Sequence, residues 1–345
     1  MNFMQNVSLA DYSTMGLGGK AAYLCEVTSR MEVLEALSWA QTHQLPAIVI
    51  GGGSNIIWRD EGFPGLLIVN NILRYEVFEE DETNVYITVG AGEPWDSVVE
   101  RSVAAGLTGI EALSLIPGKT GATPIQNVGA YGQDISQTLA TVEAFDAQAR
   151  DFVTLAGSDC AFGYRTSRFK TTDRGRFFIT AVTLHLRRGN PLPPFYGSVQ
   201  TYFEEHDIHT YTPALLREAV VAIRSAKLPD PAKVRNVGSF FANPIIPEEQ
   251  FTQLQASYEG LPHWKADGGV KLSAAWLVEQ IGLKGYRDEA TGMATWPEQP
   301  LVFVNESAET TADLFAFKKQ VVDAVQAKFG VTLQQEPELL PLQTT

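Results

Sequence analysis

The most constraining feature of the sequence is the stretch from residue 116 to 132, which is too rich in glycine and proline to form a helix or a regular strand. It reads IPGKTGATPIQNVGAYG and holds four glycines, two prolines and one charged residue, Lys119. The segment has too little charge to remain in solvent, and its backbone N–H and C=O groups need partners if it is buried. We therefore expect this loop to wrap around a ligand; the alternative is a buried loop that satisfies its own backbone.

A second glycine-rich segment, GGGSN at 51–55, directly follows an apolar strand expected at 47–50. Three adjacent glycines let backbone N–H groups approach an anionic ligand without a Cβ in the way, so a pyrophosphate would fit there. The spacing is not the Gly-x-Gly-x-x-Gly of a Rossmann turn and predicts no nicotinamide site. An ordinary glycine turn is the alternative.

Composition narrows the class of protein. The chain has 345 residues with 26 Lys plus Arg against 40 Asp plus Glu, a formal net charge of −14, which argues against a nucleic-acid binder. Only two cysteines occur, without a CxxC pair or clustered histidines, so we expect neither disulfides nor a metal site. The absence of a secretory signal and of an 18-residue apolar run predicts a cytoplasmic protein that does not enter a membrane.

Apolar periodicity predicts alternating strands and helices, and the length favours two domains. Strands are expected at 23–27, 47–50, 65–69, 85–89, 177–184 and 301–304, and helices at 31–42, from Pro94 onward, at 213–224, 274–281 and 311–329. Gly330 is expected to end the last helix. The proline-rich start of the stretch 190–211 predicts a linker followed by a loop.

Five motifs in a fixed order carry a family resemblance. They are GGGSN at 51–55, the loop 116–132, YRTSRFK at 164–170, KLPDP at 227–231 and NVGSFFANP at 236–244. Together they resemble the UDP-N-acetylenolpyruvoylglucosamine reductases, the MurB family of bacterial cell-wall synthesis, in its longer class with a tyrosine loop. The resemblance extends over nearly the whole chain, to Glu338.

The resemblance implies an α+β fold. Residues 1–190 would form a two-part FAD-binding domain of the flavin oxidase/reductase (PCMH-like) type, divided near residue 70. Residues 191–212 would be a linker and substrate loop, and 213–345 a C-terminal α/β substrate-binding domain. The implied reaction is the NADPH-dependent reduction of UDP-N-acetylglucosamine enolpyruvate to UDP-N-acetylmuramate through bound FAD, by a monomer.

The resemblance also assigns residues. Those expected around FAD are Gly51, Gly52, Gly53, Ser54, Asn55, Pro117, Gly118, Gly121, Ala122, Gln126, Asn127, Gly129, Ala130, Tyr131 and Gly132. Those expected to contact the UDP-sugar are Tyr196, Lys227, Asn243 and Gln299. The expected catalytic residues are Arg165, which offers a forked cation to the substrate carboxylate, Ser239, which protonates the carbon, and Glu338, which when protonated donates to the developing charge.

Positive charge gathers near these motifs. Residues 165–176 carry five cations and one acid, and residues 217–235 carry five cations and two acids, which suits a diphosphate ligand in an otherwise acidic chain. Ordinary solvated charge remains the alternative for Arg174 and Arg217.

Two short segments depart from the family pattern. They are Lys119-Thr120, which bears on the flavin contacts, and 339–341 (LLP), which bears on the placement of Glu338. Two other functions stay open: a flavin oxidase of a sugar or hydroxy acid on the same fold, and a non-catalytic nucleotide-sugar binding protein.

Overall fold

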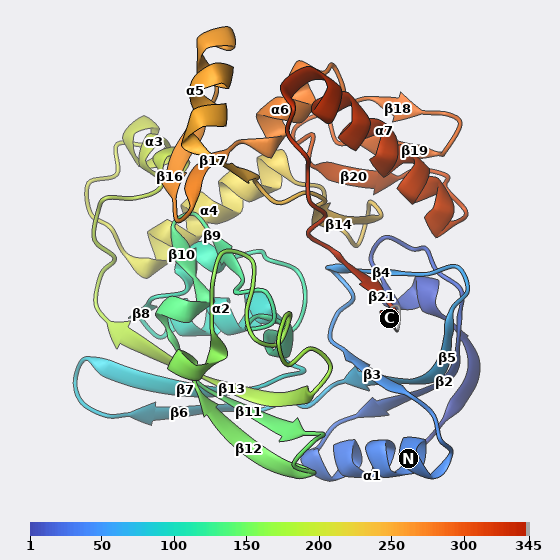
Figure 1. The fold of residues 1–345 in the computed structure, drawn as a ribbon. Helices are drawn as coiled ribbons and strands as arrows, with labels where there is room; N and C mark the ends of the chain where they lie inside the picture. Colours follow the sequence, from blue (N-terminus) through green and yellow to red (C-terminus); the bar gives the residue numbers. More distant parts are fainter. Residues whose placement is uncertain (343–345) are drawn as a thin grey trace. The chain divides into compact units, whose positions relative to one another are not determined.

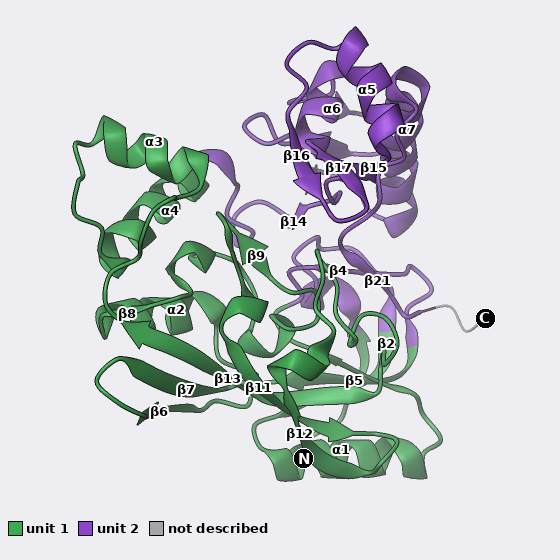
Figure 2. Cartoon of the chain, turned by 60° about the vertical axis from the view of Figure 1, so that its left-hand side comes forward, with its two compact units in different colours: residues 1–7, 21–52, 64–226 green, residues 8–20, 53–63, 227–345 purple. Residues whose placement is uncertain are grey.

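A computed structural model describes residues 1–342 and divides them into two compact units (Figures 1 and 2). Unit 1 comprises 1–7, 21–52 and 64–226, and is green in Figure 2. Unit 2, in purple, comprises 8–20, 53–63 and 227 onward. No helix in the described part of the chain combines the length and apolar character that a membrane span requires.

The first sheet of unit 1 has four strands in the order β1-β2-β5-β3. The strands are β1 (Met4–Ser8), β2 (Lys20–Val27), β5 (Phe63–Asn70) and β3 (Ala47–Ile50). Helix α1 (Arg30–Thr42) begins at Ser29, whose side chain accepts a hydrogen bond from the Glu32 N–H, and buries Val33, Ala36 and Ala40 in the same core cluster as β2 and β5. The predicted helix and strands are confirmed, with β5 lying between β2 and β3.

The second sheet of unit 1 follows the order β12-β11-β13-β7-β6, with β8 paired to β13. Its strands are β6 (Tyr75–Glu79), β7 (Asn84–Gly90), β8 (Leu107–Thr108), β11 (Leu139–Asp146), β12 (Asp151–Ala156) and β13 (Phe177–Arg188). Helix α2 (Trp95–Ala104) packs Trp95, Val98 and Val99 into the same core. The chain between these strands supplies the loop 116–132.

The loop expected after the proline-rich linker contains helix α3 (Gly197–Glu205), so the expected lack of regular structure there is wrong. The assignment of residues 191–212 as a linker and substrate loop remains a prediction. Val199 and Phe203 of α3 are buried with Leu216 of α4 (Pro213–Lys227). The aromatic residues of this stretch pack together and against α4. This packing stabilises a helix although the stretch begins with several prolines. Tyr131 of the loop 116–132 packs against the same cluster.

Unit 2 contains the remaining sheets. Its strands are β14 (Asn236–Ser239), β20 (Val302–Asn305), β19 (Met293–Thr295) and β18 (Arg287–Asp288) in one sheet, β15 (Ile245–Ile246), β17 (Gly269–Leu272) and β16 (His263–Ala266) in a second, and β4 (Ile56–Trp58) with β21 (Glu338–Leu340) in a third. Stacked and edge-on contacts join Phe240, Phe241, Phe303 and Phe317 in its core.

Three helices, α5 (Glu248–Ser257), α6 (Ala274–Gln280) and α7 (Thr311–Phe329), complete unit 2. A capping box formed by Thr310 and Asp313 begins α7, and Gly330, with φ 66°, ends it as predicted.

The compact units cut the chain differently from the expected domain boundaries. Residues 8–20 and 53–63 belong to unit 2, because β21 near the C-terminus pairs with β4, and nearly all of α4 belongs to unit 1. The expected functional division at 190 and 213 remains a prediction, since compactness does not reveal which residues hold a cofactor or a substrate.

Candidate active site

The loop 116–132 is embedded in unit 1 by its backbone. The Thr120 N–H donates to the Glu93 carbonyl at 2.9 Å, and the Gly121 N–H donates to the Ala91 carbonyl at 3.0 Å, just beyond the end of β7. Only a single 3-10 turn (120–122) and the two-residue strand β9 (Gly129–Ala130) interrupt its irregular course; β9 pairs with β10 (Gln133–Asp134). The expected absence of a helix or long strand is confirmed.

The two glycine-rich segments meet within unit 1. A Cβ placed on Gly52 would lie 3.1 Å from the Cα of Gly118, and one on Gly51 would lie 3.3 Å from the Cβ of Lys119. A Cβ on Gly121 would lie 2.5 Å from that of Ala91. Side chains are thus excluded where the two backbones approach each other, which fits a cradle for a phosphate-containing cofactor.

The rest of the GGGSN segment belongs to unit 2. Gly53 has φ 70°, and a Cβ there would lie 2.3 Å from the Tyr12 carbonyl oxygen, so only glycine suits this position. The Asn55 carbonyl accepts the Glu338 N–H at 2.9 Å. The boundary between the compact units therefore runs through a motif that the sequence presents as one segment.

The motif at 163–167 is hydrogen-bonded to the loop 116–132 at three points. The Asn127 side-chain amide donates to the Gly163 carbonyl at 3.2 Å, Arg165 Nη2 donates to the Gly129 carbonyl at 2.7 Å, and the Ser167 hydroxyl donates to the Ile125 carbonyl at 2.6 Å. Asn127 Oδ1 also accepts the Ser136 N–H at 3.1 Å. These bonds fix the position of the expected catalytic arginine against the expected flavin loop.

The remaining expected cofactor residues of this loop, Pro117, Ala122, Gln126, Ala130 and Gly132, lie along the same segment of unit 1. Burial raises the pKa of the Tyr131 hydroxyl, and the positive charge of Arg224 opposes this rise. The edge of its ring meets the Tyr196 ring with 5.6 Å between centroids. The expected flavin loop and the expected substrate tyrosine are therefore in contact within unit 1.

In unit 2, the other two expected catalytic residues lie on adjoining segments. Ser239 ends β14 beside Gly238, whose φ is 73°, and the next residue, Phe240, accepts the Glu336 N–H through its carbonyl at 2.9 Å. Two residues further on, Glu338 begins β21, in register with Ile56 of β4. Within residues 1–342, no side-chain hydrogen bond is formed by the half-buried Ser239 hydroxyl.

The segment 339–341 that departs from the family pattern has a structural role. Leu339 packs against the core of unit 2 and Leu340 is buried, while the Arg59 N–H donates to the Leu340 carbonyl at 2.8 Å. These apolar residues extend β21 and fix the start of the strand at Glu338.

The expected substrate residues have different surroundings. Lys227 is exposed at the end of α4, and Tyr196 is 47% exposed before α3. The Asn243 side-chain oxygen accepts the Ala274 N–H at the start of α6, and Gln299 holds a turn before β20. Asn243 and Gln299 thus serve the fold of unit 2 in addition to any contact with a ligand.

Several cations expected to attract a diphosphate are paired with acids instead. Arg176 donates to Asp146 at 2.7 Å and to Asp173 at 3.0 Å, and Arg168 donates to Asp173 at 2.7 Å. The bonds from Arg176 hold the pKa of the Asp146 carboxyl well below its usual range. The ion pairs of Arg168 and Arg176 reduce the positive charge that the cluster 165–176 offers to an anion, and the expected diphosphate contact of the cluster remains a prediction.

Lys119, the other departure from the family pattern, is a tether between the loop and β5. Its Nζ donates to the Asn70 carbonyl at 2.8 Å and to Asn71 Oδ1 at 2.5 Å. Burial lowers the pKa of its ammonium group. The Lys119 ammonium group therefore has hydrogen-bond acceptors within unit 1, and its side chain lies next to Gly51.

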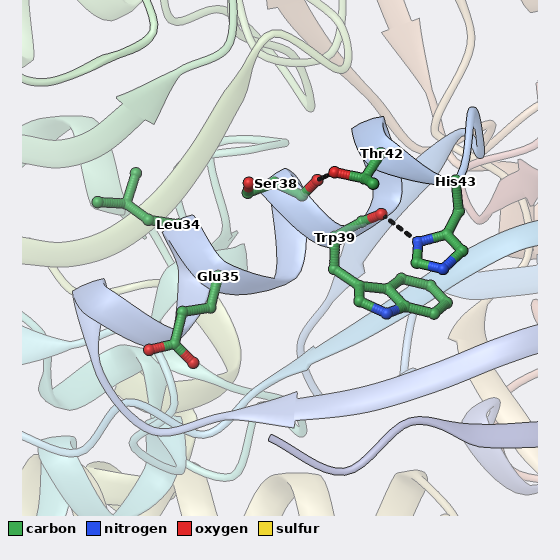
Figure 3. Close-up of a pocket in the computed structure, with 6 residues that line it drawn as sticks. All are labelled: Leu34, Glu35, Ser38, Trp39, Thr42 and His43. Atoms are coloured by element: carbon green, nitrogen blue, oxygen red, sulfur yellow. Dashed lines mark hydrogen bonds between the residues drawn. The ribbon is translucent and has the colours of Figure 1, made fainter.

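A surface groove on α1 is unrelated to these residues. Figure 3 shows that its lining comes from α1 and the next residue, His43, with the Trp39 ring beside the His43 ring. The hydrogen bonds drawn there connect residues four apart along this segment. None of the expected site residues lies in the groove. Among residues 1–342, no group of three or more His, Cys, Asp or Glu side chains is arranged to hold a metal ion.

Sequence reasoning missed the contacts of Arg224 on α4. Its Nη2 donates to the Leu115 carbonyl at 3.2 Å, and burial lowers the pKa of its guanidinium. The spacing of Arg217 and Arg224, seven residues apart on a predicted helix, was the available signal because it places both on one helical face.

Comparisons with known proteins agree with the motifs. Residues 21–150 match the family described as "FAD binding domain", and residues 230–340 match "UDP-N-acetylenolpyruvoylglucosamine reductase, C-terminal domain". The chain is 38% identical over 342 residues to the UDP-N-acetylenolpyruvoylglucosamine reductase of Chromobacterium violaceum, with 99% of each chain covered. It is 41% identical to that of Thermobifida fusca, with 98% of each chain covered.

Among solved structures, the chain resembles the UDP-N-acetylenolpyruvylglucosamine reductase (MurB) from Thermus caldophilus. The TM-score is 0.69 at 25% identity, over 99% of this chain and all of the other. The expected α+β class, with an FAD-binding domain and a C-terminal domain, is confirmed. On the similarity of its whole length and of both its domains, the chain belongs to the UDP-N-acetylenolpyruvoylglucosamine reductase family.

Proposed function

We infer that this chain is an FAD-dependent oxidoreductase that reduces UDP-N-acetylglucosamine enolpyruvate to UDP-N-acetylmuramate in peptidoglycan precursor synthesis. The observation that carries the inference is the full-length similarity to reductases named for this substrate, in a chain that also matches an FAD-binding domain. NADPH is the proposed reductant, and the protein is proposed to act in the cytoplasm as a monomer.

The close approach of the two glycine-rich segments in unit 1 supports the loop 116–132, Gly51 and Gly52 as part of the FAD site. We assign Gly53, Ser54 and Asn55 to the same site from the motif. When bound, FAD supplies the hydride for the enolpyruvyl carbon. The chain must then bind the substrate, stabilise its carboxylate and deliver a proton.

Arg165 is proposed to bind the substrate carboxylate. Its Nη2 is directed to the Gly129 carbonyl, so the guanidinium has a fixed position beside the loop while its planar fork has further N–H donors. A bidentate contact to a carboxylate would stabilise the enolate-like charge that develops during the reaction.

Ser239 is proposed to donate the proton to the carbon, and Glu338, when protonated, to donate to the developing carboxylate charge. The Ser239 side chain has no hydrogen-bond partner within the described residues, so no protein acceptor competes for its proton. Lys227, Asn243, Gln299 and Tyr196 are proposed to bind the UDP-sugar.

The visible spectrum of the purified protein tests this function. We expect peaks of bound oxidised flavin that are bleached by NADPH and restored by the enolpyruvyl substrate, with UDP-N-acetylmuramate as the product. An oxidase would instead consume oxygen rapidly with its own substrate. A colourless protein that binds UDP-sugars would support the non-catalytic alternative.

The flavin is proposed to be bound without a covalent link, because neither glycine-rich segment contains a cysteine or a histidine. Acid precipitation should release the yellow colour into the supernatant. Colour that remains with the protein pellet would contradict this assignment.

A further inference from the structure

Arg224 acts on the polypeptide near both ends of the loop 116–132. Its Nη2 donates to the carbonyl of Leu115, the residue before the loop, at 3.2 Å. The positive charge of the same guanidinium acts on the buried hydroxyl of Tyr131, near the other end, and opposes the rise in its pKa that burial causes. A single side chain of α4 therefore acts at two positions that are 16 residues apart in sequence, one just before the loop and one near its end.

The backbone at both positions is left-handed. Leu115 has φ 55° and Tyr131 has φ 48°, although neither is a glycine. Such conformations are sparsely populated for residues with a Cβ and persist only where neighbouring groups hold them. Arg224 bonds to the first of these residues, and its charge acts on the second, which packs against the cluster that includes α4.

A second set of bonds holds Leu115 from its other side. The Leu115 N–H donates to Asp96 Oδ1 at 2.6 Å, and Arg217 donates to both oxygens of Asp96, at 2.6 and 2.9 Å. Arg217 and Arg224 lie two turns apart on α4. The N–H and the carbonyl of Leu115 are thus each fixed through an arginine of one helix.

The contacts of Tyr131 continue to the expected substrate tyrosine. The Tyr131 and Tyr196 rings meet edge to face, and Tyr131 packs against the cluster formed by α3 and α4. The Arg224 Nε is buried and has no hydrogen-bond partner within residues 1–342, so it is not part of a fully satisfied structural network.

We propose that Arg224 is a positioning residue, which fixes Leu115 and Tyr131 so that the loop 116–132 holds the flavin and Tyr131 supports Tyr196 over the UDP-sugar. It acts through these residues rather than on the reacting atoms. The inference rests on the proposed function, because it assigns the loop to FAD and Tyr196 to the substrate.

The test compares Arg224→Met, which keeps much of the side-chain bulk, with Arg224→Lys, which keeps the charge but not the fork. In Arg224→Met we expect FAD to leave the diluted holoenzyme about tenfold faster and the KM for the UDP-sugar to rise about tenfold, as when a charge-assisted bond is lost. The rate constant kcat at saturating substrate should change by less than about threefold, since no reacting group is removed. Arg224→Lys should fall between Arg224→Met and the wild type.

Two further variants separate positioning from general destabilisation. Leu115→Gly relieves the left-handed strain, so Arg224→Met should accelerate flavin release less in that background than in the wild type. Tyr131→Phe keeps the ring but removes the hydroxyl, and it should raise flavin release by a few fold. Arg187→Met, at an exposed position on β13, is the control and should behave as the wild type.

Wild-type rates of flavin release and a wild-type KM in both Arg224→Lys and Tyr131→Phe would overturn the proposal, even if Arg224→Met fails to fold. Equal acceleration of flavin release by Arg224→Met in the Leu115→Gly and wild-type backgrounds would also overturn it. These results leave the proposed function intact as long as the wild type is yellow and forms product. A colourless, inactive wild type would contradict the proposed function itself.

Discussion

The loop 116–132 in unit 1 and the end of β14 in unit 2 differ in how their polar side chains are hydrogen-bonded. Asn127 of the loop uses both its amide nitrogen and its oxygen in hydrogen bonds, and Arg165 and Ser167 bond to the loop backbone. Ser239 follows a left-handed glycine, and its side chain forms no hydrogen bond within residues 1–342.

The difference agrees with the roles that we propose for the two regions. A loop that binds a cofactor must hold one conformation, so its side chains form hydrogen bonds with the surrounding backbone. A proton donor must hand its proton to the substrate, and a strong bond to a protein acceptor would oppose that transfer. The bonds of Asn127 and Ser167 therefore support a positioning role for these side chains, and the lack of a protein partner for the Ser239 hydroxyl within residues 1–342 supports its proposed role as a proton donor.

The largest expected effect comes from Ser239→Ala. The variant should fold, bind FAD and be reduced by NADPH at a near-normal rate, because none of these steps needs the serine proton. Reoxidation by the enolpyruvyl substrate should fall by at least about 10²-fold, the lower range for loss of a positioned general acid. Stopped-flow absorbance of the two half-reactions measures both rates.

Ser239→Cys is the matched variant, because a thiol can donate a proton from nearly the same place, and it should recover part of the lost rate. A role of Ser239 only in the turn before Phe240 would instead lower stability by about 1 kcal/mol and leave both half-reactions nearly intact. Normal reoxidation in the alanine variant would show that Ser239 is not the proton donor. The proposed difference in role between the end of β14 and the loop 116–132 would then be wrong.

Asn127→Ala tests whether the hydrogen bonds of the loop 116–132 hold its conformation. The variant loses two hydrogen bonds from a buried side chain and places alanine at φ 49°, which asparagine tolerates better. We expect a loss of about 2 kcal/mol in the free energy of unfolding and faster release of FAD. Denaturant unfolding of the holoenzyme and flavin fluorescence after dilution measure these effects.

Asn127→Asp keeps an oxygen for the Ser136 N–H but removes the donor to Gly163, so its loss should be smaller. If Asn127→Ala were as stable as the wild type and released FAD no faster, the hydrogen bonds of the loop would not serve to position the cofactor.

Lys227→Ala tests whether an exposed cation, which forms no ion pair with residues 1–342, binds the ligand. Loss of one charge-assisted contact should raise the KM for the UDP-sugar about tenfold, or ~1.5 kcal/mol, and leave flavin reduction at saturating NADPH nearly unchanged. Steady-state kinetics at several substrate concentrations give the result. An unchanged KM would show that Lys227 is ordinary surface charge.

The sequence predicts those parts of the molecule that depend on local patterns. Periodicity locates α1, α4 and α7 to within a few residues, and a single glycine marks the end of α7. The lack of regular structure in the loop 116–132 follows from its glycines and prolines.

Long-range pairing could not be predicted in the same way. β21 joins β4 across more than 280 residues, so the GGGSN segment is divided between the units, and no local pattern encodes this. Charge counts also could not show that Arg176 pairs with Asp146, because a cation near a motif can be neutralised by an acid that only the fold brings close. Helix α3 was missed for a similar reason. The prolines at the start of the stretch 190–211 predicted a linker and a loop, and the packing of its aromatic residues became visible only in the fold.

The smallest expected effect concerns Asp146→Asn, which tests whether Arg176 has a structural partner rather than an anionic ligand. Asp146 is buried and accepts two bonds from Arg176 and one each from the Gln148 and Ala149 N–H groups. The bonds from Arg176 lower the pKa of the folded carboxyl below the unfolded value of about 3.9. The ionised group therefore stabilises the fold above about pH 4, and this contribution is lost as the pH falls through the folded pKa.

Asp146→Asn removes the charge while keeping an oxygen for the N–H donors. Its melting temperature should lie a few degrees below that of the wild type above about pH 5, and the two should converge as the pH falls below about 3. Thermal unfolding over this range measures the difference, and the KM for the UDP-sugar should stay unchanged throughout because Arg176 is already paired. A rise in KM without a pH-dependent change in melting temperature would instead assign Arg176 to the ligand, and the contrast between structural and free cations would then fail at this residue.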